Sequence, residues 1–161
     1  MSNQRTVIAL PAEQTISFSR KFEAPAARVF EAHTDPGLLA RWTGPVGTTV
    51  TLREFDPRTG GSWSYIVKGL GREWPFHGSF HEVTPPSRIV QTWESDEEPG
   101  HPTLEVFTFV DLSEGRSRID GLTLFLSVED RDANMLGGFD SGRDQDFERL
   151  DQLLAGTSMP G

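Results

Sequence analysis

The chain has 161 residues, of which 35% are hydrophobic and 24% are charged, a composition typical of one soluble globular domain. The 24 acidic and 15 basic residues give a net charge of −9, which argues against nucleic acid or a membrane as partner, because phosphate groups attract Lys and Arg. The absence of cysteine excludes disulfides, thiolate catalysis and Cys-ligated zinc, and the lack of a signal peptide or a membrane-length apolar run predicts a cytoplasmic protein.

The first 14 residues are expected to form an N-terminal extension. Val7, Ile8 and Leu10 fit a short strand, which Pro11 would interrupt. From residue 15 the pattern becomes regular, because apolar residues at 16, 18 and 22 alternate with polar ones. This alternation predicts a half-buried strand.

A helical corner is predicted for residues 22–45. Pro25 suits the first turn of a helix, where its missing N–H would have had no partner. Asp35 and Pro36 then fit the N-cap and first position of a second, short helix. We expect Trp42 to be buried where this second helix meets a sheet.

After Gly47 the pattern predicts six strands without intervening helices, which favours an antiparallel meander. The turns are marked by glycine and proline, and residues 94–103 read as an acidic loop. The chain then returns to helix, with Gly156 as its expected end. One face of this helix is apolar and the other polar; the apolar side carries Phe147, Leu150, Leu153 and Leu154, and the polar side Arg143, Asp144, Glu148 and Asp151. The fold class is therefore α+β, with one long helix covering the sheet.

Catalytic and metal-binding motifs are scarce, and we expect no cofactor and no catalytic residue. There is no G-x-S-x-G or Walker A pattern. His77 and His81 would lie about 13 Å apart on one strand, too far to share an ion, so no metal is expected. His33 fits a structural role as a cation at a helix end. Glu82 and Arg88 fit a surface pair across the turn at Pro85.

Aromatic residues are frequent in the predicted strands and the last helix. They fit either a filled core or the wall of an apolar pocket between sheet and helix, and the residue pattern leaves both open. The set comprises Trp42, Trp63, Tyr65, Trp74, Phe76, Phe80, Trp93, Phe107, Phe109, Phe125, Phe139 and Phe147.

From about residue 15 to 154 the chain resembles single-domain proteins similar to the C-terminal domain of the activator of the Hsp90 ATPase, within the START-like, helix-grip superfamily. The resemblance rests on the order and spacing of many short motifs. These are Ala24-Pro25, Val29-Phe30, Thr34-Asp35-Pro36, Trp42, Gly60-Gly61, Trp63, Gly78, Phe80, Glu82-Val83, Pro85-Pro86, Arg88-Ile89-Val90, Trp93, Gly138-Phe139, Gly142 and Phe147-Glu148-Arg149-Leu150. It implies a domain over residues 15–155, a tail from 156 to 161, and a curved antiparallel sheet wrapped around the long helix.

The resemblance further implies a protein that binds a small hydrophobic or amphipathic molecule in a cavity between the sheet and the last helix. The residues implied as its lining are Trp42, Trp63, Tyr65, Phe80, Trp93, Phe107, Phe139, Arg143 and Phe147. A cyclase- or aromatase-like enzyme of the superfamily and a co-chaperone-like interaction module are the alternatives. An Hsp90-type chaperone is not the expected partner, because the activator that names the family has a further N-terminal domain; a homodimer is left open.

Arg143 departs from the resemblance, because relatives carry a large apolar residue at this position. A buried guanidinium without a partner is too costly for a dry pocket. Arg143 should therefore reach solvent, pair with an acidic neighbour, or meet an acidic group of the ligand. The last option predicts that carboxylates bind better than uncharged analogues.

Overall fold

The computed structural model of the chain describes residues 4–9 and 13–157. The elements in chain order are β1 (Val7–Ala9), β2 (Thr15–Phe22), α1 (Ala26–Thr34), α2 (Pro36–Trp42), β3 (Thr48–Phe55), β4 (Ser62–Gly69), β5 (Arg72–Thr84), β6 (Arg88–Ser95), β7 (Thr103–Asp111), η1 (Ser113–Gly115), β8 (Ser117–Phe125), α3 (Val128–Leu136) and α4 (Phe139–Thr157). The predicted strand at the N-terminus is therefore present as β1, although Leu10 and Pro11 lie outside the described residues.

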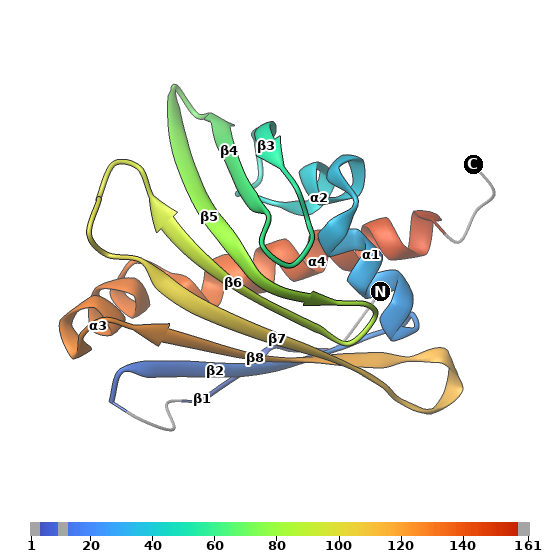
Figure 1. Cartoon of the computed structure of the whole chain (residues 1–161). Coiled ribbons are helices and arrows are strands. Elements are labelled where there is room, and N and C mark those ends of the chain that lie inside the picture. The colour runs from blue at the N-terminus through green and yellow to red at the C-terminus, as the bar shows by residue number, and fades with distance from the viewer. Residues whose placement is uncertain (1–3, 10–12, 158–161) are drawn as a thin grey trace.

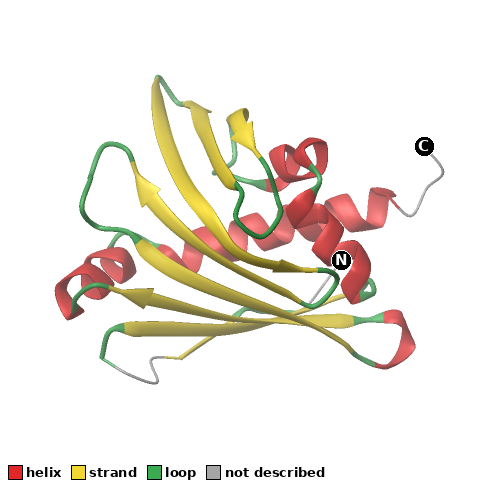
Figure 2. Ribbon diagram, in the orientation of Figure 1, coloured by secondary structure: helices red, strands yellow, loops and turns green. Residues whose placement is uncertain are grey.

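All eight strands form one antiparallel sheet in the order β1-β2-β8-β7-β6-β5-β4-β3. The sheet curves around α4, which crosses its concave side, while α1 and α2 lie near one end of the sheet and α3 near the other (Figures 1 and 2). A twisted sheet with one apolar face needs such a cover. This arrangement confirms the predicted helix-grip fold.

The corner between β2 and β3 forms as the sequence predicts. The Asp35 carboxylate accepts a hydrogen bond from the Leu38 backbone N–H at 3.0 Å, and Pro36 opens α2. Trp42 is 5% exposed, and its indole N–H donates to the Ala32 carbonyl oxygen at 2.9 Å. The buried indole therefore ties the end of α2 back to α1.

Helix α4 buries all four residues predicted for its apolar face, namely Phe147, Leu150, Leu153 and Leu154. Two of the four residues predicted for its polar face point inward instead. Asp151 pairs with the buried Arg20 of β2, and Arg143 pairs with Glu105 of β7. Gly156 does not end α4, since the helix runs on to Thr157. None of the helices in the described part of the chain combines the length and apolarity needed to span a bilayer.

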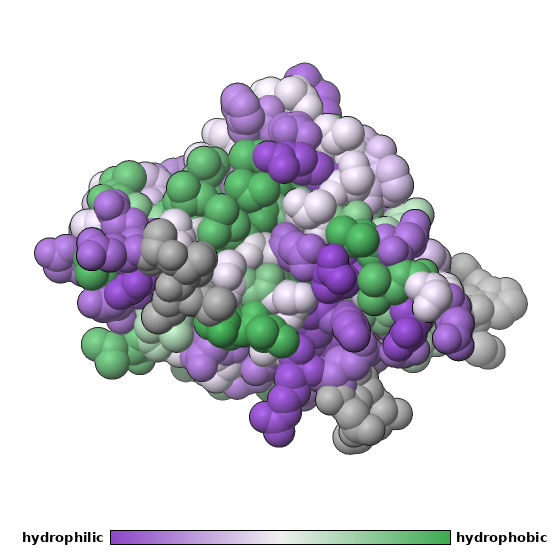
Figure 3. Space-filling model, turned by 90° about the horizontal axis from the view of Figure 1, so that it is seen from below, coloured by the Kyte–Doolittle hydropathy of each residue, from purple (hydrophilic) through white to green (hydrophobic). Residues whose placement is uncertain are grey.

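The outer surface combines hydrophobic and hydrophilic residues. Viewed from below, separate hydrophobic patches lie among hydrophilic residues (Figure 3). The predicted surface pair of Glu82 and Arg88 is present in the structure, with 3.2 Å between the carboxylate and guanidinium and both side chains about one third exposed or more. Such exposed pairs contribute little to stability.

Candidate functional site

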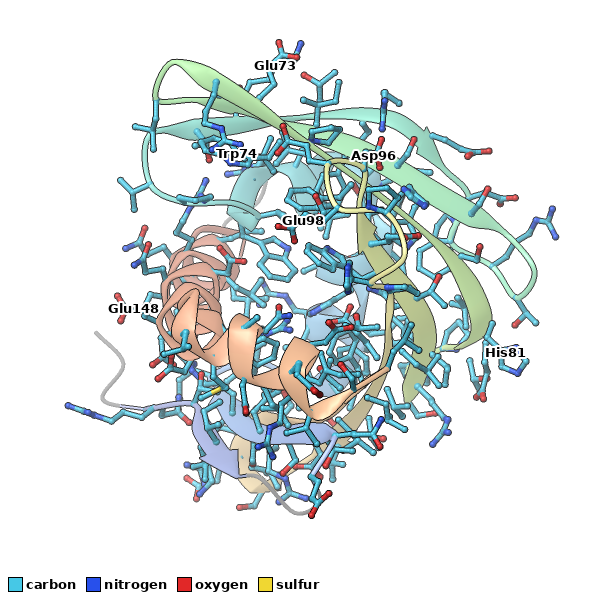
Figure 4. All side chains as sticks on the ribbon, turned by 90° about the vertical axis from the view of Figure 1, so that its left-hand side faces the viewer. Glu73, Trp74, His81, Asp96, Glu98 and Glu148 are labelled. Atoms are coloured by element: carbon cyan, nitrogen blue, oxygen red, sulfur yellow. The ribbon has the colours of Figure 1, made fainter. Side chains whose placement is uncertain are left out.

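A pocket of about 660 Å³ lies between the concave face of the sheet and the N-terminal half of α4. Its mouth is at the end of the molecule that faces the viewer in Figure 4, below the β4–β5 hairpin and beside the loop that joins β6 to β7. Trp74 comes to this mouth from β5, and Glu98 points inward from the loop (Figure 4). The volume lies within the range of small-molecule sites, roughly 300–1,000 Å³.

Eight of the nine residues implied as lining border this pocket: Trp42, Trp63, Tyr65, Phe80, Trp93, Phe107, Phe139 and Arg143. The ninth, Phe147, is 1% exposed and belongs to the core. Its ring packs against Phe18, Phe22 and Trp42, with centroids 5.3 to 6.2 Å away, so neighbours leave it no free face. Contact of the eight with a ligand stays a prediction.

One wall of the pocket is a continuous row of aromatic rings from β4, β5 and β6. Trp63 stacks on Tyr65 with 5.0 Å between centroids, Tyr65 meets the edge of Phe76 at 5.8 Å, and Phe76 stacks on Trp93 at 4.8 Å. Burial raises the pKa of the Tyr65 phenol, against the effect of a hydrogen bond from the Trp93 side chain. This wall offers flat apolar surface that suits another aromatic or aliphatic group.

The floor of the pocket carries a polar row that the sequence analysis missed. Gln91, Glu105 and Thr123 are register partners on β6, β7 and β8, so their side chains stand next to each other on the concave face. Glu105 accepts a hydrogen bond from the Gln91 amide at 3.0 Å. The sequence pattern could have indicated the inward position of Glu105, because residue 105 shares the inward parity of Phe107 in the alternation of β7.

Arg143 reaches from α4 across the pocket to this row. One of its terminal nitrogens donates to Glu105 at 3.3 Å, and its side chain is 18% exposed against 9% for Glu105. The guanidinium also lies over four aromatic rings at 4.9 to 5.8 Å, those of Phe18, Phe107, Phe139 and Phe147. Of the three roles considered for Arg143, pairing with an acidic neighbour is the one present in the structure.

Two further titratable groups border the pocket. His33 Nδ1 lies 2.8 Å from the Val29 carbonyl oxygen, and because a carbonyl oxygen can only accept a hydrogen bond, Nδ1 carries the proton and donates. Burial, helped by Arg143, lowers the pKa of His33 to about 4. The predicted cation at this helix end is therefore wrong, since His33 is neutral at pH 7. The cause is its position against Trp42 and Phe109, with ring centroids 4.8 and 5.1 Å away.

The pKa of Asp146 is shifted upward, whereas that of His33 is shifted downward. Burial raises the pKa of its carboxyl to about 6, although Arg143, Arg149 and the Gly44 backbone N–H favour the ionised form. Arg149, one turn further along α4, donates to backbone carbonyl oxygens of Arg41, Thr43 and Gly44. These contacts fix the end of α2 against α4 and hold the loop that carries Gly44 at the edge of the pocket.

The histidines of β5 do not contribute to the pocket. His81 points away from the molecule on the outer side of the sheet (Figure 4). His77 is also on the outer side, where its ring nitrogens lie 2.6 Å from Asp96 and 3.2 Å from Glu94. No group of three metal-ligating side chains suited to an ion occurs among residues 4–9 and 13–157.

Comparison with known proteins agrees with this architecture. A crystal structure of a protein from Rhodobacter sphaeroides superposes with a TM-score of 0.88 at 25% identity, covering 94% of this chain and 99% of the other. A solution structure from Arthrobacter aurescens (TM-score 0.84, 22% identity, coverage 92% and 91%) and a crystal structure from Nitrosomonas europaea (0.80, 24%, 92% and 99%) share the fold.

No protein with a curated description matches the sequence. The family described as "Activator of Hsp90 ATPase homolog 1-like protein" matches residues 23–155, from the end of β2 almost to the end of α4. This span contains the aromatic wall of the pocket, the polar row and the helical corner, so the match covers the sheet-and-helix arrangement apart from β1 and β2. The chain therefore belongs to the family of Activator of Hsp90 ATPase homolog 1-like proteins.

Proposed function

We propose that the protein binds a small hydrophobic or amphipathic molecule in the pocket between the sheet and α4. The observation that carries this proposal is the composition of the lining: a pocket of about 660 Å³ combines a continuous aromatic wall with a short row of polar groups. Apolar surface provides affinity in such sites, and a few placed polar groups provide orientation. The family's fold is consistent with this role.

The test uses the neutral fluorescent probe N-phenyl-1-naphthylamine, whose emission rises when it leaves water. Saturable binding of one probe per chain with a micromolar Kd is the expected result. The site is then blocked at Gly142, which lines the pocket and where an added Cβ would meet no atom within 4 Å. In Gly142→Trp the indole should occupy the pocket and reduce probe affinity at least about tenfold, equivalent to about 1.4 kcal/mol.

Gly156 provides a matched control on the same helix. It is exposed, does not line the pocket, and an added Cβ there also meets no atom within 4 Å. Because glycine is a poor helix former, neither exchange should destabilise α4 through backbone propensity. Gly156→Trp should bind the probe as the parent does, and equal loss in both variants, or no binding by the parent, would refute the proposal.

Catalysis in the same pocket is the second candidate, favoured by one observation. His33 and Asp146 both border the pocket with pKa values shifted toward each other's range, as acid–base groups in active sites often are. With the proton on Nδ1, the Nε2 of His33 is a free base. Exchange of the α-protons of 2-tetralone in D₂O, followed by NMR, tests this: a saturable acceleration lost in His33→Gln would support it, and the buffer rate alone would exclude it.

A further inference from the structure

The polar row formed by Gln91, Glu105 and Thr123 lines the pocket from the concave face of the sheet. Thr123 is 1% exposed, and its hydroxyl has no hydrogen-bond partner in the structure. Glu105 is 7% exposed and is shared between the Gln91 amide and the Arg143 guanidinium. A buried hydroxyl without a partner is costly, so this row is prepared to receive a donor or acceptor from another molecule.

The charges around this row are already balanced. Among the described residues that line the pocket, Arg143 is the only basic one besides the neutral His33, and it faces Glu105. Two more acidic residues line the pocket, Asp146 on α4 and Glu98 at the mouth. A ligand carboxylate would therefore add negative charge to a lining that is negative overall, whereas a ligand ammonium placed at the row would face the guanidinium. At the row itself Glu105 and Arg143 already neutralise each other, so either ligand charge would be desolvated there without a counter-ion of its own.

An uncharged group that both donates and accepts meets neither penalty. Its carbonyl oxygen can accept from Arg143, which uses one terminal nitrogen for Glu105 and has further N–H groups on a rigid fork. Its N–H or O–H can donate to the Thr123 hydroxyl or to a remaining lone pair of Glu105. The aromatic wall of Trp63, Tyr65, Phe76 and Trp93 is available for a flat apolar body.

We propose that the row of Gln91, Glu105 and Thr123, with Arg143, is a specificity subsite that selects flat apolar ligands whose inner polar group is uncharged and both donates and accepts hydrogen bonds, such as an aromatic carboxamide. This proposal rests on the proposed ligand-binding function. It reverses the preference for carboxylates expected from the sequence, because that preference required a guanidinium without an acidic neighbour.

The experiment compares three probes that share one naphthalene body: 2-naphthamide, 2-naphthoate and 2-naphthylmethylammonium. Each displaces N-phenyl-1-naphthylamine from the protein at pH 7.5. The carboxamide should bind at least about tenfold more tightly than either charged probe, the effect of one charge-assisted hydrogen bond against a desolvated charge. A carboxylate or ammonium that binds as tightly as the carboxamide would overturn the proposal.

Two variants assign the effect to the row. Glu105→Gln keeps the shape of the side chain but frees the guanidinium of Arg143, so 2-naphthoate should gain at least about tenfold relative to 2-naphthamide. Thr123→Val removes only the unpartnered hydroxyl and should weaken 2-naphthamide several-fold without lowering the melting temperature, whereas Thr123→Ser should retain its affinity. An unchanged ratio in Glu105→Gln, or equal carboxamide affinity in Thr123→Val and Thr123→Ser, would show that the row does not select.

The two proposals fail in different ways. If N-phenyl-1-naphthylamine does not bind the parent protein, the ligand-binding function fails and the subsite with it. If it binds and is blocked by Gly142→Trp, but the three naphthyl probes displace it equally, the pocket binds ligands and only the subsite is refuted.

Discussion

Each half of α4 forms an ion pair between an arginine and a carboxylate with the sheet, but the two pairs differ in geometry and exposure. In the C-terminal half, Asp151 holds Arg20 through two hydrogen bonds of 2.9 and 2.7 Å, and Arg20 is 2% exposed. In the N-terminal half, Arg143 holds Glu105 through one bond of 3.3 Å, and Arg143 is 18% exposed. Between the two pairs lies Phe147, with the Arg20 guanidinium 6.0 Å and that of Arg143 5.8 Å from its ring.

The difference shows which end of the sheet is closed and which is prepared for a partner molecule. The pair of Arg20 and Asp151 is bidentate and largely withdrawn from solvent, so it fixes the position of α4 on β2. The pair of Arg143 and Glu105 leaves donor groups directed toward a pocket of about 660 Å³. Phe147 marks the boundary between a packed core and a cavity, which explains why it does not line the pocket.

The largest effect is expected at the boundary itself, in Trp42→Ala. The exchange removes a buried indole that contacts Phe147 and His33 and donates to Ala32. The free energy of unfolding, measured by urea denaturation, should fall by roughly 3–5 kcal/mol. The control is Trp74→Ala at the pocket mouth, where the loss should stay below about 1 kcal/mol. A loss that small for Trp42 as well would mean that the corner does not close this end of the sheet.

The second prediction breaks each arginine pair in turn. Arg20→Met leaves Asp151 without its counter-ion in a packed region and should cost about 3 kcal/mol. Arg143→Met leaves Glu105 with the hydrogen bond from the Gln91 amide beside a pocket that water can enter, so the loss should be smaller, about 1–2 kcal/mol. The two variants carry the same replacement and are compared in one denaturant series. Equal losses would contradict the distinction between a structural pair and a pair that serves the pocket.

The sequence predicts the fold well and the site incompletely, and the residues show why. Alternation on β2 and periodicity on α4 reveal which positions face inward, so the core and the corner at Asp35 follow from local rules. The same parity places Arg20 and Glu105 inside, but alternation predicts apolar side chains at inward positions, and both charged residues depart from it. Their partners cannot be read from one sequence, because Asp151 lies 131 positions from Arg20 and Arg143 lies 38 from Glu105.

The third prediction concerns the carboxylate of Asp146, which borders the pocket and has no ion-pair partner among the described residues as close as those of Asp151 and Glu105. Burial raises the pKa of Asp146 to about 6, above the value near 3.9 of an unfolded chain. The folded protein therefore binds this proton more tightly, so stability falls as pH rises from about 4 through 6. Asp146→Asn should remove this loss and be more stable than the parent by about 1–2 kcal/mol at pH 7.5, less than the full shift implies because the side chain is partly exposed.

The gain in Asp146→Asn should disappear at pH 4, where the carboxyl is protonated in the folded parent. The quantity to compare is the difference in free energy of unfolding between variant and parent, because His33 gives stability the opposite dependence on pH. Its pKa, lowered to about 4, makes stability fall as pH drops from about 6.5 through 4, and this contribution cancels in the difference. A gain that is the same at pH 4 and pH 7.5 would show that the carboxyl of Asp146 is not shifted.

The smallest effect is expected on the outer face of the sheet, where pairs are exposed and should behave unlike both pairs on α4. The hydrogen bond to Asp96 raises the pKa of His77, so the stabilisation is complete below the ordinary value near 6.5 and is lost as pH rises through the raised value. Because the His77 side chain is 48% exposed, His77→Gln should cost less than about 1 kcal/mol at pH 5.5 and nothing at pH 9. Denaturation in 1 M salt, where the screening length is about 3 Å, should reduce even the loss at pH 5.5. A larger loss that salt does not change would mean that His77 fixes the β6–β7 loop at the pocket mouth through Asp96 and Glu94, and the outer face would then have to be counted as part of the site.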